Sequence, residues 1–423
     1  MSNSSAPKLV VIGQGYVGLP LSVRAVEAGY DVVGIDFDQR RIDALNRGES
    51  YVEDVSNAAL TAARATGRYR ATDDYATASD FEFAVITVPT PLKDSLPDLS
   101  YIESSGASLA PHITRGATVV LESTTYPGTT QELLLPILES GSGLTAGADF
   151  HVGYSPERID PGNPKFSFKT TPKIVSGIDA ASLERVDRLF SDLVDETVPV
   201  STPREAEMAK LLENTFRHVN IALVNELAVF AHELGVNVWE AIDAAATKPF
   251  GYMKFTPGPG VGGHCLPIDP SYLSWKVRTE LGRSFRFVEL ANDVNEHMPD
   301  HVVQRTMHIL NDQNKALRGS NVVLIGIAYK KDSGDSRESP AVRIIELLNN
   351  YGANVLAVDS HVEDHRWPEG ATRVDLDAAT IESADIAIVV TDHSDIDLSL
   401  LIDSSVPVFD TRNSVDGSNV SRL

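Results

Sequence analysis

The stretch Val10-Val11-Ile12-Gly13-Gln14-Gly15-Tyr16-Val17-Gly18 decides the fold of the first part of the chain. It joins a short apolar run to the pattern G-x-G-x-x-G, and a helix-like segment and a second apolar run ending before Asp36 follow it. Glycines at this spacing allow a tight turn and let backbone N–H groups approach a pyrophosphate, while the later acid can accept ribose hydroxyls. The stretch therefore predicts a strand, a turn and a helix that bind a dinucleotide.

The choice between the two nicotinamide dinucleotides depends on Asp36. Its negative charge would repel the 2′-phosphate of NADP, so we predict NAD as the cofactor. Arg40 and Arg41 could in principle meet a phosphate, although a solvated helix start also explains both arginines.

Apolar strand-like runs alternate with helical patterns around this motif, which is typical of a parallel sheet covered by helices. We predict strands at residues 9–12, 31–35, 83–88, 118–122 and 151–154, and again at 322–327, 354–359, 386–391 and 406–410. Long helical stretches lie between the two groups, at about 203–234 and 287–311. The fold class predicted is α/β, with two Rossmann-like doubly wound parallel-sheet domains joined by a long central helical region. The expected domains are residues 1–200, 201–312 and 313–423.

Composition limits the class of protein. A chain of 423 residues with 42% hydrophobic residues should form two or three globular domains. A formal net charge of -23 would repel nucleic acid and anionic membranes, and no apolar run is long enough to cross a bilayer. One cysteine allows neither an internal disulfide nor a multi-cysteine metal site, so we expect a cytoplasmic protein without a metal.

Lys210 and Asn214 lie four residues apart in a predicted helix and so share one face. A lysine can stabilise a developing oxyanion and an asparagine can orient an oxygen, as the oxidation of an alcohol requires. A solvated helix face explains the same spacing equally simply.

The only cysteine, Cys265, follows four glycines within six positions and His264, and Asp269 stands one turn further on. Dense glycine permits close approach of a ligand to the main chain. An inert small residue is one interpretation of Cys265. The other is a nucleophile that adds to an aldehyde to give a thiohemiacetal. Loss of a hydride from this adduct leaves a thioester, and water then releases the carboxylate product and the thiol.

These motifs together resemble the UDP-glucose/GDP-mannose dehydrogenase family over nearly the whole chain. The resemblance rests on GQGYVGLP (13–20), VPTP (88–91), EST (122–124), SPER (155–158), Lys210 with Asn214, GGHC (262–265) with Asp269, and AYKKD to RES (328–339).

The resemblance implies a role for each catalytic position. Cys265 matches the nucleophile, Lys210 and Asn214 match the residues that hold the oxyanion at C6, and Asp269 matches the one that assists proton transfer. Thr124 and Glu157 match positions that order the hydrolytic water or act as acid and base. Two NAD molecules per turnover, a homodimer built on the central helix and a C-terminal domain for the nucleotide are also implied.

We expect two groups of binding residues. The cofactor group is Gly13, Gly15, Tyr16, Val17, Gly18, Asp36, Arg41, Pro89, Thr90, Thr124 and Lys331. The substrate group is Glu157, Arg158, Lys210, Asn214, Arg217, Gly262, Lys330 and Arg412.

The substrate suggested is a UDP-sugar. KPFGYM (248–253), the Gly-His-Cys form of the loop and NTFR (214–217) resemble the UDP-N-acetylhexosamine branch more than the UDP-glucose branch, and Pro161 replaces a second glutamate near Glu157. UDP-N-acetylglucosamine is therefore favoured over UDP-glucose or dTDP-glucose. Two alternatives stay open: a catalytically inactive nucleotide-sugar sensor, and a β-hydroxyacid-type dehydrogenase that transfers one hydride and needs no thiol.

Overall fold

The structure is a computed structural model that describes the chain except for residues 1–5, 94–95, 161–162, 164, 264–265 and 403. It contains two compact units, Met1–Glu213 and Asn214–Leu423. The finer division into domains 1–200, 201–312 and 313–423 stays a prediction.

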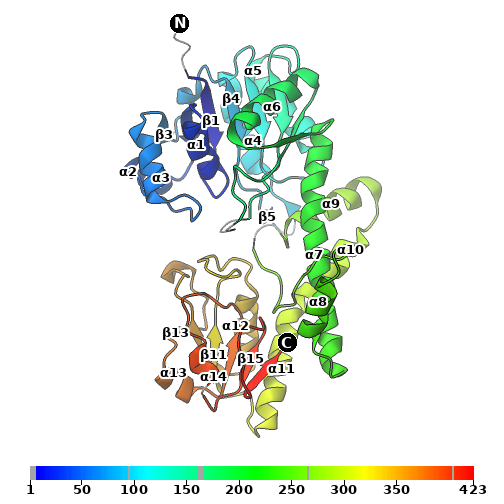
Figure 1. Ribbon diagram of the computed structural model, residues 1–423. Coiled ribbons are helices and arrows are strands. Elements are labelled where there is room, and N and C mark those ends of the chain that lie inside the picture. Colours follow the sequence, from blue (N-terminus) through cyan, green and yellow to red (C-terminus); the bar gives the residue numbers. More distant parts are fainter. Residues whose placement is uncertain (1–5, 94–95, 161–162, 164, 264–265, 403) are drawn as a thin grey trace. The chain divides into compact units, whose positions relative to one another are not determined.

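The first unit is built on a sheet in the order β10-β9-β8-β7-β4-β1-β2-β3 (Figure 1). Its strands are β1 (Lys8–Ile12), β2 (Asp31–Ile35), β3 (Tyr69–Thr72), β4 (Phe83–Ile86), β7 (Thr118–Leu121), β8 (His151–Tyr154), β9 (Lys173–Gly177) and β10 (Thr197–Pro199). All pairs are parallel except β8 with β9, which is antiparallel. A small antiparallel pair, β5 (Leu92–Lys93) and β6 (Leu96–Pro97), stands apart. The predicted parallel sheet is confirmed, and it is extended at the β9–β10 edge by two strands that were not predicted and that join it through the antiparallel β8–β9 pair.

Helices cover both faces of this sheet, because alternate strand residues point to opposite sides and both sets are apolar. Leu9 and Val11 join one core, and Val10 and Ile12 join the other. The first core contains α1 (Gly18–Glu27), α2 (Gln39–Arg47), α3 (Asn57–Ala65) and α6 (Ala180–Leu193). The second contains α4 (Ser100–Leu109) and α5 (Leu135–Ser142). Short turns of other helix types occur at Tyr75–Ala78, Ala110–His112, Thr130–Leu134 and Asp364–Arg366.

The second unit contains a fully parallel sheet in the order β13-β12-β11-β14-β15-β16. Its strands are β11 (Asn321–Ile325), β12 (Asn354–Val358), β13 (Thr372–Arg373), β14 (Ile386–Val389), β15 (Val408–Asp410) and β16 (Val420–Arg422). Its helices are α8 (Val238–Ala246), α9 (Asp269–Leu281), α10 (Arg286–Glu296), α11 (Met298–Asp312), α12 (Pro340–Asn350), α13 (Ala378–Ser383) and α14 (Ser399–Ile402).

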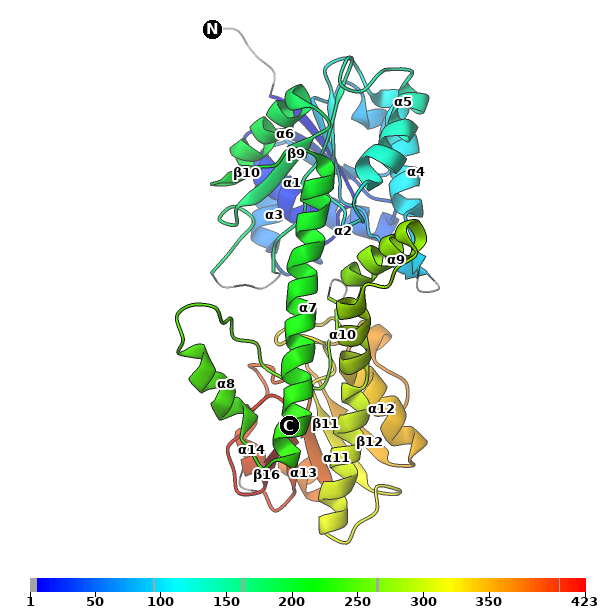
Figure 2. The ribbon, with the colours of Figure 1, turned by 90° about the vertical axis from the view of Figure 1, so that its right-hand side faces the viewer.

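The longest helix, α7 (Pro203–Glu233), contains the last residues of the first unit and the first residues of the second (Figure 2). It begins at Pro203, where proline fits the first turn, and Thr202 and Glu205 cap that turn. Its later half packs with α8, α11 and one face of the second sheet in a single core. No helix within the described ranges is both long and apolar enough to span a bilayer.

The predicted fold class is confirmed, and so is every predicted strand, with ends that match or are shifted by at most two residues. The stretch predicted as one helix at 287–311 is two, α10 and α11, because the chain breaks just before Pro299. Short or edge strands such as β3, β9, β10, β13 and β16 were not predicted. Except for β9, these strands have two to four residues, which is too few to stand out as an apolar run.

Replacing Glu207 by alanine should destabilise the first unit. The Glu207 carboxylate is fully buried in α7 and accepts hydrogen bonds from Gly128 N (2.6 Å), Thr130 N (2.9 Å) and Thr130 Oγ1 (2.7 Å). Alanine would leave three buried donors without an acceptor, so we expect the free energy of unfolding to fall by about 3 kcal/mol or more. Denaturant unfolding measures the change. Glu184→Ala, at an exposed position of α6, should alter it by less than about 0.5 kcal/mol.

Candidate active site

The glycine motif follows β1, between β1 and β4, where the chain changes from adding strands on one side of β1 to adding them on the other. This reversal of strand order is the usual place for a ligand in an open parallel sheet. Gly13 has φ 94°, and a Cβ there would lie 2.9 Å from Thr87 O. A Cβ on Gly18 would collide with Gly13 O, whereas the space around Gly15 is open. Val17, before the first turn of α1, gives it no side-chain cap. The turn therefore keeps space and helix N–H groups available for a pyrophosphate.

Asp36, at the end of β2, is buried with 4% exposure. Its Oδ2 accepts from Gln14 N at 2.9 Å and its Oδ1 accepts from Asp38 N at 3.0 Å, so each oxygen keeps a further lone pair. Arg41 Nη1 lies 3.6 Å from Asp36 Oδ2, and its guanidinium stands 5.5 Å from the centre of the Tyr51 ring. These residues fit an adenosine ribose and pyrophosphate, as NAD would supply.

Asp36→Ala should weaken NAD binding by about 10- to 100-fold, because hydrogen bonds to a charged acceptor contribute about 1.5–3 kcal/mol. The loss for NADP should be smaller, since the repulsion of its 2′-phosphate disappears together with the hydrogen bonds. Titration calorimetry with both cofactors measures the two changes. Asp31→Ala, at the exposed opposite end of the same strand, is the matched control and should leave both affinities within about twofold.

Further along the same sheet edge, Thr90 and Thr124 are joined by a hydrogen bond from Thr90 Oγ1 to Thr124 O of 2.8 Å. They follow β4 and β7, whose parallel pairing brings both loops to the same edge. Pro89 belongs to the first of these loops. The cofactor residues predicted in the first unit thus follow neighbouring parallel strands, whereas Lys331 belongs to the second unit.

A buried acid–lysine cluster occupies the next position on this edge. Glu122 follows β7 and Glu157 follows β8, and these strands are parallel neighbours. Lys173 is the first residue of β9, which runs antiparallel to β8, so its ammonium reaches the same edge. Lys173 Nζ contacts Glu122 Oε1 and lies 3.2 Å from Glu157 Oε2. Glu122 and Lys173 were given no role in the sequence analysis. The signal for Glu122 is its place at the end of a predicted strand, in the EST motif, and the signal for Lys173 is a lysine at the start of an apolar run.

Lys210 lies beside this cluster. Its side chain is buried, and its Nζ donates to the Glu157 main-chain oxygen at 2.6 Å. An ammonium has three donors, so the one bond to Glu157 does not exhaust them. Arg158 is held by an ion pair to Glu213 (2.6 Å) and by a hydrogen bond to Pro172 O (2.7 Å). The structure therefore groups the predicted residues Glu157, Arg158 and Lys210.

In the second unit, Asn214 Nδ2 donates to Asp269 Oδ2 at 2.5 Å, and both side chains are 4% exposed. Asp269 is the first residue of α9. The amide nitrogen of Asn214 has a second hydrogen with which to hold an oxygen. Two predicted catalytic residues 55 positions apart are thus in direct contact. His264 and Cys265, a few positions before Asp269, lie outside the described residues.

The glycines before Cys265 allow the loop to lie directly on the end of the second sheet. A Cβ on Gly262 would be 2.6 Å from Tyr329 Cβ and 2.7 Å from Glu338 O, and a Cβ on Gly258 would be 2.8 Å from Arg412 Nη1. Arg412 is fixed in turn by a hydrogen bond from its Nε to Val390 O of 2.6 Å. Gly262 and Arg412, both predicted at the substrate, therefore belong to one packed assembly in this unit.

A polar network supports the start of this loop and was not predicted. Asn225 Oδ1 accepts from Gly258 N at 2.9 Å, and Asn225 Nδ2 donates to Asn295 Oδ1 at 2.9 Å. Asn295 Nδ2 lies 3.4 Å from His218 Nδ1. Burial is the largest influence on the His218 imidazole and lowers its pKa, which favours the neutral ring that this network requires. The sequence did not predict this network, because an asparagine within a helix does not show by its position alone which residue it will contact.

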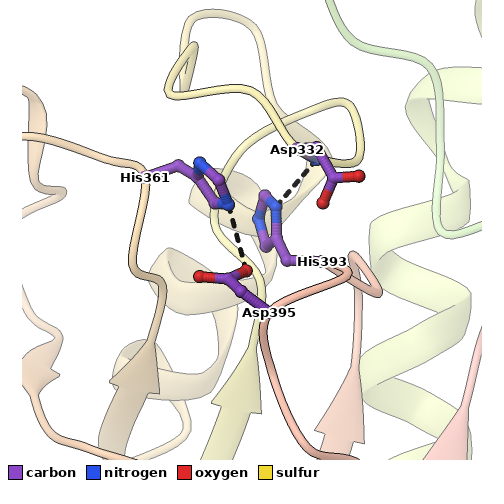
Figure 3. A group of neighbouring side chains, drawn as sticks. All are labelled: Asp332, His361, His393 and Asp395. Atoms are coloured by element: carbon purple, nitrogen blue, oxygen red, sulfur yellow. Dashed lines mark hydrogen bonds and ion pairs between the residues drawn. The ribbon is translucent and has the colours of Figure 1, made fainter. Parts of the chain in front are cut away.

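Figure 3 shows a second group of ionisable side chains, Asp332, His361, His393 and Asp395. His361 Nε2 lies 3.0 Å from Asp395 Oδ1, and Asp332 N donates to His393 Nδ1 at 2.9 Å. The two imidazole rings stack with centroids 4.6 Å apart and planes 29° from parallel. A metal lies in the plane of each ligand ring, which stacked rings do not permit for one shared ion. These contacts favour a hydrogen-bonded clamp between loops.

Three residues predicted to bind the substrate or the cofactor are not grouped with the other predicted site residues by the contacts described above. Arg217 is exposed on α7. Lys330 and Lys331 follow β11, and Lys331 Nζ lies 3.1 Å from Asp392 Oδ2. Their assignment to ligands stays a prediction.

Comparison with known proteins agrees with this architecture. Three models of the UDP-glucose/GDP-mannose dehydrogenase family match: the NAD binding domain at 7–194, the central domain at 204–297 and the UDP binding domain at 323–417. The chain is 35% identical to the UDP-N-acetyl-D-mannosamine dehydrogenase of Pyrococcus horikoshii over 387 residues, which covers 91% of this chain and 89% of that protein. It is 32% identical to the Escherichia coli K12 enzyme of the same name over 400 residues, 91% and 93% of the two chains.

A solved structure of UDP-D-ManNAc dehydrogenase from Pyrococcus horikoshii superposes with a TM-score of 0.90 at 33% identity and covers 98% of each chain. The glycine turn and Asp36 lie within the segment that the NAD binding domain matches, and most of the second sheet lies within the segment that the UDP binding domain matches. The chain therefore belongs to the UDP-glucose/GDP-mannose dehydrogenase family and is an NAD-dependent oxidoreductase.

Proposed function

We propose that the protein oxidises the C6 primary alcohol of a UDP-N-acetylhexosamine to the carboxylate, in two hydride transfers with a covalent intermediate on Cys265. The observation that carries the proposal is the buried contact between Asn214 and Asp269. It joins the helix that bears Lys210 to the first residue of α9, four positions after the cysteine.

In the first oxidation, different residues of the chain hold the C6 oxygen and assist proton transfer. Lys210 supplies an ammonium and Asn214 an amide N–H on consecutive turns of α7, where they hold the oxygen of C6 as negative charge develops on it. Asp269 orients Asn214 and assists proton transfer. Bound NAD supplies the hydride acceptor.

The second oxidation starts when the Cys265 thiolate adds to the C6 aldehyde. The sulfur–carbon bond forms as the carbonyl becomes an oxyanion, which Lys210 and Asn214 hold again. Loss of a hydride, which a second NAD would accept, gives a thioester. Thr124 and Glu157 then order and deprotonate the water that attacks it, so that the acid leaves and the thiolate returns.

Five further residues are proposed to bind the substrate: Arg158, Arg217, Gly262, Lys330 and Arg412. Support for this group is the contact of the glycine loop with Tyr329 and Arg412 at the end of the second sheet. Most of that sheet lies within the segment matched by the family's UDP binding domain, with β16 after its end.

The sugar is the finer part of the proposal. The sequence motifs favour a UDP-N-acetylhexosamine, and relatives at 32–35% identity are named for UDP-N-acetyl-D-mannosamine. Another relative, at 34% identity, is named for an NDP-N-acetyl-D-galactosaminuronic acid. UDP-N-acetylmannosamine is therefore the first substrate to test, followed by the UDP-N-acetylglucosamine that the motifs favoured over UDP-glucose.

The test is the NADH released from a panel of UDP-N-acetylmannosamine, UDP-N-acetylglucosamine, UDP-N-acetylgalactosamine, UDP-glucose and dTDP-glucose. We expect two NADH per sugar and the highest kcat/KM with an N-acetylhexosamine. One NADH per sugar would favour the β-hydroxyacid-type alternative. Binding of these sugars without any NADH would favour the inactive sensor.

We also propose that a second copy of the chain covers an apolar stripe on α7, formed by Phe216, Leu223, Leu227 and Phe230. Their spacing of seven, four and three residues places them on one helix face, and each is 45–53% exposed. Contiguous exposed apolar residues on a long helix are typical of a subunit interface. This agrees with the homodimer that the family resemblance implies.

Replacing Leu223 and Leu227 together by glutamate should convert the dimer into a monomer, because four charges would be buried without partners in a symmetric interface. Light scattering after size-exclusion chromatography measures the mass. Leu400→Glu, at a leucine of α14 that is 39% exposed outside the stripe, should leave the mass unchanged. A wild-type monomer would contradict the proposal.

A further inference from the structure

The buried carboxyl of Glu122 lies in the same cluster as Glu157, and the function proposed above does not use it. The Lys173 ammonium stands between the two acids, in contact with Glu122 Oε1 and 3.2 Å from Glu157 Oε2. Glu122 is 1% and Lys173 is 3% exposed. Three ionisable groups therefore share one site from which water is largely excluded.

The carboxyl groups of both acids are in contact with a single ammonium, that of Lys173, because Lys210 donates to the main-chain oxygen of Glu157 and to neither carboxyl group. If both acids were ionised, one of the two negative charges would therefore have no cation in direct contact. The Phe190 and Phe168 rings lie 5.2 and 5.3 Å from Lys173 Nζ and supply no positive charge. An uncompensated charge in such a site is costly, so the cluster favours one additional proton.

The hydrogen bonds indicate which acid holds that proton. Glu157 Oε1 accepts from Arg158 N and Ile159 N, both at 2.6 Å, as an ionised carboxylate does. Glu122 Oε2 is buried and receives no donor from any part of the chain that the structure describes. An ionised Glu122 would carry charge on an oxygen that nothing solvates, whereas a neutral carboxylic acid would not.

We propose that Glu122 is a neutral carboxylic acid at neutral pH and shares its proton with the Glu157 carboxylate. The proton moves between one oxygen of each acid, and no other bond changes. The charged groups that face the pair are Lys173 from β9 and Lys210 from α7, which donates to the main chain of Glu157. The neighbouring strand β4 contains only apolar residues.

The acid–base properties of the two groups support this assignment. Burial is the largest influence on Glu122 and raises its pKa to about 8, and the charge of Glu157 and a hydrogen bond to it act in the same direction against Lys173. Burial also acts on Glu157, but the Lys173 ammonium and hydrogen bonds from Glu122 and Ile159 N hold the pKa of Glu157 below its ordinary value. The pair titrates as a unit.

The direct test is the infrared spectrum of protein labelled with 13C-glutamate, which separates protonated carboxyls from carboxylates without any need for activity. At pH 7, Glu122→Gln should remove one protonated carboxyl absorption. Loss of a carboxylate absorption instead would overturn the proposal. Glu82→Gln is the matched control and should remove a carboxylate, because Glu82 pairs with Arg185 (3.1 Å) and Arg188 (3.4 Å).

If Glu122→Gln does not fold, Glu122→Asp keeps a titratable group in a shorter side chain. In protein labelled with 13C-aspartate, this variant should show one additional protonated carboxyl absorption relative to the wild type. The appearance of an additional carboxylate absorption at pH 7 would count against the shared proton.

The consequence for catalysis rests on the proposed function. As the pH rises through about 8, Glu122 loses its proton, and a second negative charge arises beside Glu157 and Lys210. That charge opposes the oxyanion at Lys210 in the wild type but is absent in Glu122→Gln. The ratio of kcat for the variant to kcat for the wild type should therefore rise about three- to tenfold from pH 6.5 to 9.5.

A purely structural role for Glu122 would lower kcat of the variant by the same factor at every pH. A flat ratio would therefore overturn the coupling to the reaction. Complete lack of dehydrogenase activity would overturn the proposed function, and the infrared result would still decide where the proton lies.

Discussion

Cys265→Ala is expected to lower the rate of acid formation at least about 1,000-fold, because no other thiol in the chain can form the thioester. The wild type should release two NADH per sugar, and the variant at most one. Measuring NADH and uronic acid in the same reaction mixture checks both numbers. Cys265→Ser should also block acid formation and accumulate an ester-like adduct, visible by mass spectrometry, because an alkoxide is a poorer leaving group than a thiolate.

The control for this variant is its binding of NAD, which depends on the first unit and should stay within about twofold of the wild type. Normal production of the acid by Cys265→Ala would contradict the covalent route. The remaining interpretation of the cysteine would then be an inert small residue of the loop.

Lys210→Ala is expected to lower kcat by about 100- to 1,000-fold, the usual cost of removing one oxyanion donor. The ammonium is buried and held in place by the Glu157 main-chain oxygen at 2.6 Å, so solvent is poorly placed to replace it. Lys210→Arg should restore little activity, because the planar guanidinium is larger and needs a different arrangement of acceptors. Steady-state kinetics with the best sugar of the panel measures both.

Lys169→Ala is the matched control for Lys210. Lys169 lies in the same unit, and its side chain is 54% exposed and 3.8 Å from Asp195. We expect its kcat within about twofold of the wild type. An increase in KM with an unchanged kcat for Lys210→Ala would assign the lysine to substrate binding alone.

The sequence predicted those parts of the fold that are encoded by local pattern. The glycine turn, Asp36 and the central strands all follow from residue type and from short apolar runs bounded by turns. The pairing of Asn214 with Asp269 does not, since 55 residues separate them and only the folded chain shows their contact. The spacing of Lys210 and Asn214 shows that they share a helix face but not that this face is buried.

The acid–lysine cluster is a second example of a contact that the sequence could not predict. Glu122 and Glu157 follow parallel strands and could be expected at one edge of the sheet. Lys173 reaches that edge only because β9 runs in the opposite direction, so that its first residue lies beside the last residues of β7 and β8. The direction of an edge strand depends on tertiary pairing, and no local pattern in five residues reports it.

The two sheets share one arrangement, a glycine after one strand and an aspartate after the next, but the two aspartates differ in how many hydrogen bonds they can still accept. Gly326 and Asp359 stand after β11 and β12 as Gly13 and Asp36 stand after β1 and β2. A carboxylate offers about four acceptor sites. Asp359 already accepts from five donors, namely Ile327 N, Ala328 N, His361 N, Val362 N and His393 Nε2.

Asp36 accepts from two backbone donors, Gln14 N and Asp38 N, among the residues described. A diol such as that of adenosine ribose can therefore donate to Asp36 after β2. It cannot do so to Asp359 after β12, because the acceptor sites of that carboxylate are already occupied. The two halves of the enzyme are alike in fold, but a nucleotide that depends on this acid can bind to only one of them. Saturation of Asp359 thus leaves the second sheet without the acceptor sites that Asp36 offers beside the first sheet.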